Sequence, residues 1–139
     1  MWQPNLFAPI TLAALTSGTS GWQTLIINPA VYPSLSNPTG SLPIKYHALI
    51  IKLFCRGSRL WLTTETPLPP VPSGISNSAL DWRLGCASEN GEPDTNTVTI
   101  PIQQASPNSS MILRYRLENA LIGPVDTTIQ LVGGHYSYE

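Results

Sequence analysis

Charged residues are scarce in this sequence. Only 11% of the 139 residues are Asp, Glu, Lys or Arg, against roughly one quarter in an average soluble domain. The net charge is −1 and no basic run occurs, so the electrostatic footprint of a nucleic-acid-binding protein is missing. A surface with so little charge is also poorly protected against association with other proteins. The composition argues against a nucleic-acid partner and favours a protein that works by assembly.

Long apolar runs are absent as well. No hydrophobic stretch approaches the roughly 18 to 20 residues of a membrane-spanning helix, so we expect no membrane partner. Pro4 and Pro9 interrupt the apolar N-terminus, and no charged residue precedes it, which argues against a signal peptide. We therefore expect a chain made in a cytoplasm. There its two cysteines, Cys55 and Cys86, would stay free thiols rather than form a disulfide.

Candidates for catalysis and metal binding are few. His47 and His135 are the only histidines, and neither lies in the local pattern of a nucleophile elbow. The cysteines and histidines lack the close spacing of a zinc site. One loop gathers three acids without the residue order of a calcium loop: Glu89, Glu92 and Asp94. We expect no catalytic residue, no metal and no cofactor, and we predict that the protein is not an enzyme.

The pattern that the sequence does contain is alternation with a period of two. Apolar residues alternate with others at residues 97–103, 111–118 and 125–131, as in strands, whose successive side chains point to opposite faces. No amphipathic helix of three turns is found, and turn signals recur about every eight to twelve residues. The sequence therefore predicts an all-β fold, an antiparallel β-sandwich or jelly roll of about eight strands.

The stretch from Leu42 to Thr64 is predicted to form a central β-hairpin. Its first half carries apolar residues on both faces, with Lys52 as the only charge, which is typical of a strand in the middle of a sheet or between two layers. Residues 55–58 (Cys-Arg-Gly-Ser) supply the turn. The alternation places His47 and Cys55 on the same face as Leu49, Ile51 and Leu53, and Lys52 on the other face, so His47, Cys55 and Lys52 do not converge on a site.

The chain is predicted to have three parts. Residues 1–21 form an N-terminal arm and a flexible break, residues 22–132 form the β-sandwich domain, and residues 133–139 form a C-terminal tail. Two proline-rich segments interrupt the sandwich. Residues 29–43 are predicted to be a long ordered loop with a function or an interface. Residues 67–72 are predicted to be a rigid crossover between the sheets, with a ligand for a proline-recognition module as the alternative.

Aromatic and basic side chains are the candidates for contacts with a partner. Trp61 lies between Leu60 and Leu62 in the sequence, so we expect it on the opposite, exposed face. There it could stack on a sugar or anchor a protein interface. The aromatic residues of the arm cover either an edge of their own domain or a neighbouring subunit. The predicted interface residues are Trp2, Phe7, Tyr32, Arg59, Trp61, Arg114, Arg116, Tyr136 and Tyr138.

A Met-initiated, charge-poor, all-β chain with arm-like ends, proline-rich segments and no catalytic constellation resembles the small structural proteins of tailed bacteriophages. The resemblance covers the whole chain in composition and architecture, and it assigns no functional residues. It implies a virion protein made in the host cytoplasm, a capsid cement or decoration protein that binds the major capsid protein as a homo-oligomer, a dimer or a trimer.

Three alternatives remain open at this point. The chain could be a tail or baseplate component that binds other virion proteins. It could be a carbohydrate-binding β-sandwich that uses Trp61 or Tyr46, or a hydrolase that uses a pair of acids.

Overall fold

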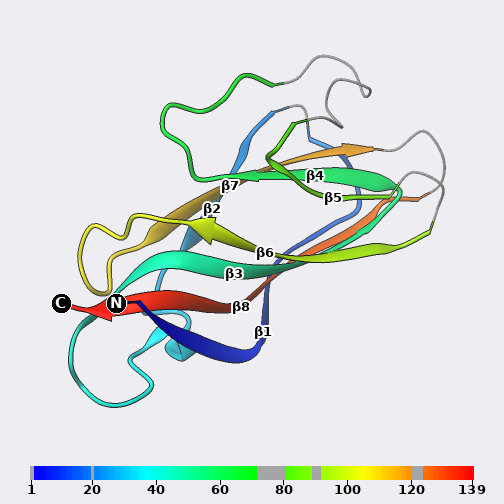
Figure 1. Ribbon diagram of the computed structural model, residues 1–139. Coiled ribbons are helices and arrows are strands. Elements are labelled where there is room, and N and C mark those ends of the chain that lie inside the picture. Colours follow the sequence, from blue (N-terminus) through cyan, green and yellow to red (C-terminus); the bar gives the residue numbers. More distant parts are fainter. Residues whose placement is uncertain (1, 20, 72–80, 89–91, 120–123) are drawn as a thin grey trace.

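A computed structural model describes residues 2–19, 21–71, 81–88, 92–119 and 124–139. These residues form eight strands and one short 3₁₀ helix (Figure 1): β1 (Gln3–Leu15), β2 (Gln23–Ile27), η1 (Pro33–Leu35), β3 (Ile44–Arg56), β4 (Ser58–Thr63), β5 (Leu84–Ala87), β6 (Asp94–Pro101), β7 (Met111–Asn119) and β8 (Asp126–Tyr138). The predicted all-β class is confirmed. Within the described ranges, no helix has the length and hydrophobicity needed to cross a membrane.

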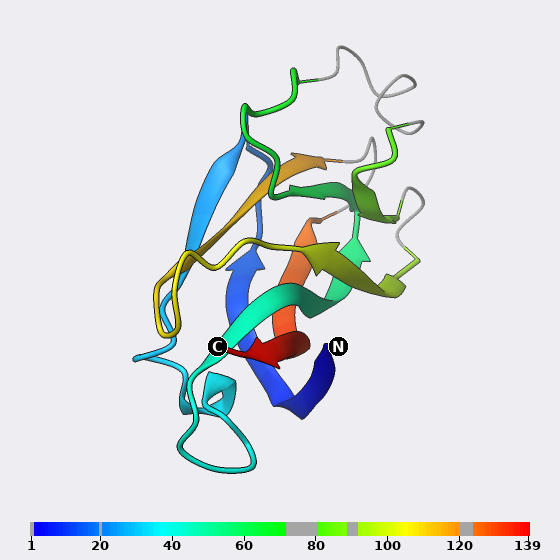
Figure 2. The same ribbon diagram turned by 60° about the vertical axis from the view of Figure 1, so that its left-hand side comes forward.

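The strands form two antiparallel sheets of four, with the orders β1-β8-β3-β6 and β2-β7-β4-β5. Figure 2 shows both layers of this sandwich. The pairing is nested, because β1 pairs with β8, β2 with β7, β3 with β6 and β4 with β5. An eight-stranded sandwich wound in this way is a jelly roll, one of the two architectures that the alternation predicts.

The core lies between the two sheets. Leu49, Ile51 and Leu53 of β3 are completely buried, and so are Leu60 of β4 and Leu113 of β7. Leu49, Ile51 and Leu53 are buried together because they are two residues apart on β3, and every second side chain of a strand points to the same face. Each such side chain stabilises the fold by about 1.5–3 kcal/mol relative to its exposed state.

The predicted central hairpin is wrong, although both of its strands exist. β3 lies in the first sheet and β4 lies in the second, where β4 pairs with β5 and β7. Gly57 turns the chain from one sheet to the other with φ 66°, in the left-handed region that favours glycine. Alternation identifies a strand, but the partner of that strand depends on the rest of the fold.

The two ends of the chain are strands of the first sheet. The segment predicted to be an arm forms β1, which pairs with β8, and the segment predicted to be a tail forms the end of β8. The glycine pair at the start of the predicted tail, Gly133 and Gly134, does not end that strand. A Cβ at Gly134 would lie 2.7 Å from Cδ1 of the Tyr46 ring, so glycine at this position makes room for a core aromatic.

A β-bulge changes the orientation of His47. Tyr46 pairs with Tyr136, whereas Ala48 pairs with His135, so His47 is an extra residue on β3. The prediction that His47 shares a face with Leu49, Ile51 and Leu53 is therefore wrong. Its ring stacks instead on Trp2, with the two centroids 4.8 Å apart.

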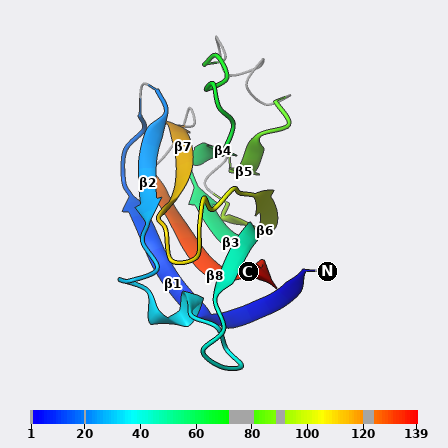
Figure 3. The ribbon, with the colours of Figure 1, turned by 90° about the vertical axis from the view of Figure 1, so that its left-hand side faces the viewer.

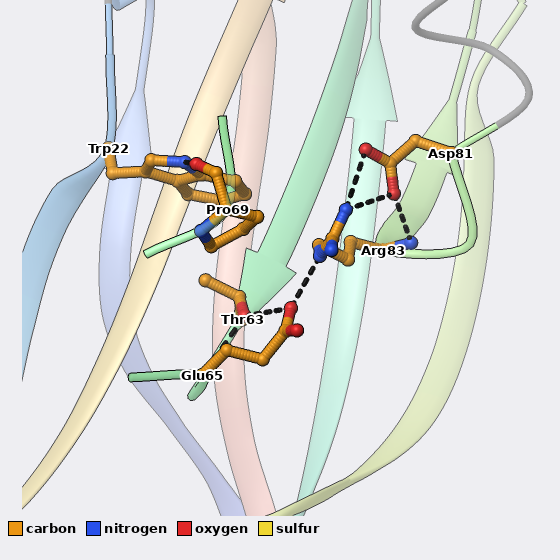
Figure 4. A network of polar contacts seen from close by, with 6 residues as sticks. All are labelled: Trp22, Thr63, Glu65, Pro69, Asp81 and Arg83. Atoms are coloured by element: carbon orange, nitrogen blue, oxygen red, sulfur yellow. Dashed lines mark hydrogen bonds and ion pairs between the residues drawn. The ribbon is translucent and has the colours of Figure 1, made fainter. Parts of the chain in front are cut away.

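The proline-rich segment after β4 does not cross between the sheets as predicted, because β4 and β5 are neighbours in the second sheet. Residue 71 is its last described residue before residue 81. Pro69 is buried, and its carbonyl accepts a hydrogen bond of 2.9 Å from Trp22 Nε1 (Figure 4). Trp22 precedes β2, and β7 lies between β2 and β4. The segment therefore crosses the outer face of β7.

Candidate functional site

The long loop between β2 and β3 is tied to the first sheet beside the chain ends (Figure 3). Asn5 Nδ2 of β1 donates hydrogen bonds to the Ser34 carbonyl at 3.0 Å and to Tyr46 Oη at 2.8 Å. Tyr46 Oη in turn donates to the Leu35 carbonyl at 3.0 Å. Because these buried groups satisfy one another, the loop has a defined position on the strands.

The end of β8 holds the same loop from the other side. Thr39 Oγ1 and Tyr138 Oη are 3.0 Å apart, and the Glu139 amide donates to the Pro43 carbonyl at 3.1 Å. The prediction that residues 29–43 are an ordered loop agrees with these contacts. Its role in an interface stays a prediction.

Five large exposed side chains lie on these joined segments, and we call them the terminal surface. They are Trp2 (55% exposed), Leu6 (70%), Val31 (64%), Leu42 (64%) and Tyr138 (42%). Exposed apolar side chains on neighbouring segments commonly mark an interaction site where they form a contiguous patch, whereas single ones need no explanation.

The terminal surface is almost free of charge. No Asp, Glu, Lys or Arg occurs before Lys45, so four of the five side chains belong to an entirely uncharged part of the chain. The cores of protein interfaces are depleted of charged residues in the same way. The overall shortage of charge was noted from the sequence, but its concentration in the N-terminal third was missed, and a count along the chain would have found it.

Trp2, His47 and Ser137 form a small cluster beside this surface. The Trp2 and His47 rings are nearly parallel, with an interplanar angle of 2°, and His47 Nε2 lies 2.6 Å from Ser137 Oγ. A nucleophile and a base in contact are the first part of a catalytic triad, which also needs a group that orients the base. In the part of the chain that the structure describes, no carboxylate hydrogen-bonds to His47. We therefore assign the cluster a structural role.

The predicted interface residues divide into three groups by exposure. Trp2 and Tyr138 are exposed and belong to the terminal surface. Phe7, Tyr32 and Arg114 are half-buried. The buried ones are Arg59, Trp61, Arg116 and Tyr136.

The prediction that Trp61 is exposed is wrong, because its exposed fraction is 0%. It does lie opposite Leu60 and Leu62, on the outer face of the second sheet. That face is covered where the segment containing Pro69 crosses it. The Arg116 guanidinium lies 4.1 Å from the centre of the Trp61 ring, and Arg116 Nη1 pairs with Glu118 Oε2 at 3.1 Å. These side chains therefore stabilise the fold and are not available to a partner.

A second polar network borders the covered face (Figure 4). Arg83 Nε bonds to Glu65 Oε2, and Arg83 Nη1 contacts both oxygens of Asp81, at 3.0 and 3.1 Å. The hydrogen bond from Arg83 holds the pKa of Glu65 below its usual value. Thr63 Oγ1 also donates to Glu65 at 3.0 Å. The three charged side chains of Glu65, Asp81 and Arg83 are thus paired with one another. The network connects Glu65, at the start of the segment after β4, to Asp81 and Arg83, which precede β5.

Cys55 and Cys86 are buried free thiols that come together from the two sheets. A hydrogen bond links them, and this bond, together with burial, raises the pKa of Cys86. Cys86 Sγ also lies 3.4 Å from Asp94 Oδ2. Among the described residues, no three His, Cys, Asp or Glu side chains are arranged to hold a metal ion. Glu89 of the predicted acidic loop lies outside those residues.

One hollow of about 450 Å³ opens between the segment after β4 and the link from β6 to β7. None of its lining side chains is titratable, so it offers no acid or base for chemistry. They belong to Thr64, Thr66, Pro101, Ile102, Gln103, Ala105, Ser110 and Ile112.

Comparison with protein-family models, curated proteins and solved structures found no match to this chain.

Proposed function

We propose that this chain is a non-enzymatic virion structural protein, a capsid cement or decoration protein that binds the major capsid protein through the terminal surface. The observation that carries the proposal is the uncharged terminal surface, on which Leu6, Val31 and Leu42 are each about two-thirds exposed. Burial of such side chains against a partner contributes about 25 cal/mol per Å² of apolar area removed from water. The five side chains themselves carry no charge that would have to be desolvated.

The architecture supports the proposal by analogy. Jelly rolls are common in viral capsid domains and in lectins, and a fold alone does not assign a function. A tail or baseplate component would present the same kind of surface to other virion proteins, and the experiment below distinguishes it by the partner.

The carbohydrate-binding alternative loses the residues on which it was based. Trp61 is 0% exposed and Tyr46 is 1% exposed, so neither ring can stack on a sugar.

The test is co-sedimentation of the full chain with shells assembled from the major capsid protein of the same virus. We expect binding that changes little with salt, because the contacts are apolar. Leu6→Asp and Leu42→Asp each introduce a charge into the terminal surface, and each should weaken binding at least about tenfold.

Ile26→Asp is the matched control. Ile26 is 65% exposed, like Leu6 and Leu42, but it lies on β2 of the second sheet. Its variant should bind shells as the unmodified chain does. No association with shells, or the same loss for Ile26→Asp, would overturn the proposal. Association with tail fractions instead would assign the chain to the tail.

A further inference from the structure

The four edge strands of the two sheets differ in how well they are protected. An edge strand presents unpaired N–H and C=O groups, and natural proteins block these with prolines, bulges, charges or a short length. β1 contains Pro4 and Pro9 and has two shifts of register against β8. β2 and β5 are only five and four residues long. Three of the four edges are therefore protected.

β6 is the exception. It is the outermost strand of the first sheet, eight residues long, and it pairs with β3 from Asp94 to Pro101 without any shift of register. Its single charge is at its first residue, and its single proline is at its last. Between them lie Thr95, Thr97 and Thr99, all exposed on the outer face of the sheet.

We propose that β6 pairs with β6 of a second copy of this chain, antiparallel and about a twofold axis through Thr97. Paired residues of two strands lie on the same face of the joined sheet. This register therefore places Thr97 opposite the partner's Thr97 and Thr95 opposite the partner's Thr99. The two first sheets become one continuous sheet of eight strands. The inference does not depend on the proposed virion function.

A second copy fits this edge because the register is self-complementary. The outer face gains three threonine–threonine pairs, a type of cross-strand pair that is favourable. Asp94 lies opposite the partner's Ile100, so no like charges meet at the axis. An isologous contact of this kind closes at a dimer and leaves no further free edge of the same type.

Two double variants test the register in the full chain. T95K/T99K places Lys opposite Lys twice, and its dimer dissociation constant should rise at least about tenfold. T95E/T99K changes the same two positions but places Glu opposite Lys twice, and it should dimerise at least as well as the unmodified chain. Sedimentation velocity over a wide range of protein concentration measures both. Thermal unfolding checks that both variants fold, as their exposed positions predict.

Thr97→Cys provides an independent measurement. In this register the two introduced thiols face each other across the axis, so oxidised glutathione should give a disulfide-linked dimer. Thr11→Cys, on the protected edge strand β1, should not. A chain that is monomeric at every concentration, equal behaviour of the two double variants, or equal cross-linking at both cysteine positions would overturn the proposal.

Discussion

The guanidinium of Arg116 lies 4.1 Å from the centre of the Trp61 ring, on the outer face of the second sheet. In a two-layer sandwich such a face is usually in contact with water. Here both side chains are buried, with exposed fractions of 4% and 0%. The bond from Trp22 to the Pro69 carbonyl holds the covering segment across the sheet. The outer face of the second sheet is therefore covered at these two side chains, and their burial stabilises the fold in addition to the core between the sheets.

Trp61→Ala should therefore destabilise the protein as strongly as a core substitution. We expect the free energy of unfolding to fall by about 3–5 kcal/mol, because a large buried ring is lost and a cavity remains. Trp82→Ala is the control, since Trp82 is 75% exposed and its ring centre lies 4.6 Å from the Arg83 guanidinium. Its cost should stay below about 1 kcal/mol. Urea denaturation measures both, and similar losses would contradict burial of Trp61.

Gly134→Ala should also destabilise the fold. Its Cβ would lie 2.7 Å from the Tyr46 ring and 2.9 Å from the Ala48 carbonyl oxygen. Neither group can move freely, so we expect a loss of about 1–3 kcal/mol. At Gly21 an added Cβ meets nothing within 4 Å, and Gly21→Ala should leave the melting temperature nearly unchanged. An equal effect at both glycines would show that the close approach to Tyr46 is not what Gly134 provides.

Tyr46→Phe removes the hydroxyl that joins β1 to the long loop. Asn5 Nδ2 would lose one acceptor and the Leu35 carbonyl would lose its donor. Burial of such unsatisfied groups costs about 1–3 kcal/mol. The control is Tyr138→Phe, because Tyr138 is 42% exposed and water can replace its contact with Thr39. Chemical denaturation should show a clear loss for the first variant and a loss below about 0.5 kcal/mol for the second.

The same tyrosine gives the stability a dependence on alkaline pH. Burial raises the pKa of Tyr46 above its usual value of 10.0. The folded state then holds the phenolic proton more tightly than the unfolded state. This contribution to stability is complete below pH 10 and is lost as the pH rises through the higher folded pKa. Urea denaturation between about pH 8 and 11 should show a fall that is smaller in Tyr46→Phe. Equal slopes in both proteins would refute the assignment to Tyr46.

The fold class was predictable because strand alternation is a local property of the sequence. The three strands predicted from alternation at residues 97–103, 111–118 and 125–131 all occur in the structure, as β6, β7 and β8. The pairing of β3 and β4 was not predictable. A glycine with positive φ is found in the turns of β-hairpins, and it is equally suited to a connection that leads from one sheet to the other.

Much less of the candidate site was predictable. Trp2 and Tyr138 were expected at an interface and are exposed at one end of the molecule. The bulge that turns His47 toward Trp2 leaves no mark in the sequence, since one extra residue reverses the faces of everything before it. The exposure of Leu6, Val31 and Leu42 depends on which strands lie beside their segments.

By itself, the sequence determined that this chain folds into strands, which faces of most strands are apolar, and that its N-terminal third carries no charge. These properties follow from residue types and from the period of two along each strand. Only the tertiary structure decided that Trp61 is buried, that the chain ends are strands of the first sheet, and that β6, among the described edge strands, is long and pairs without a bulge. Each of these depends on contacts between residues far apart in the chain, and no local pattern specifies which partner a strand or a face will have.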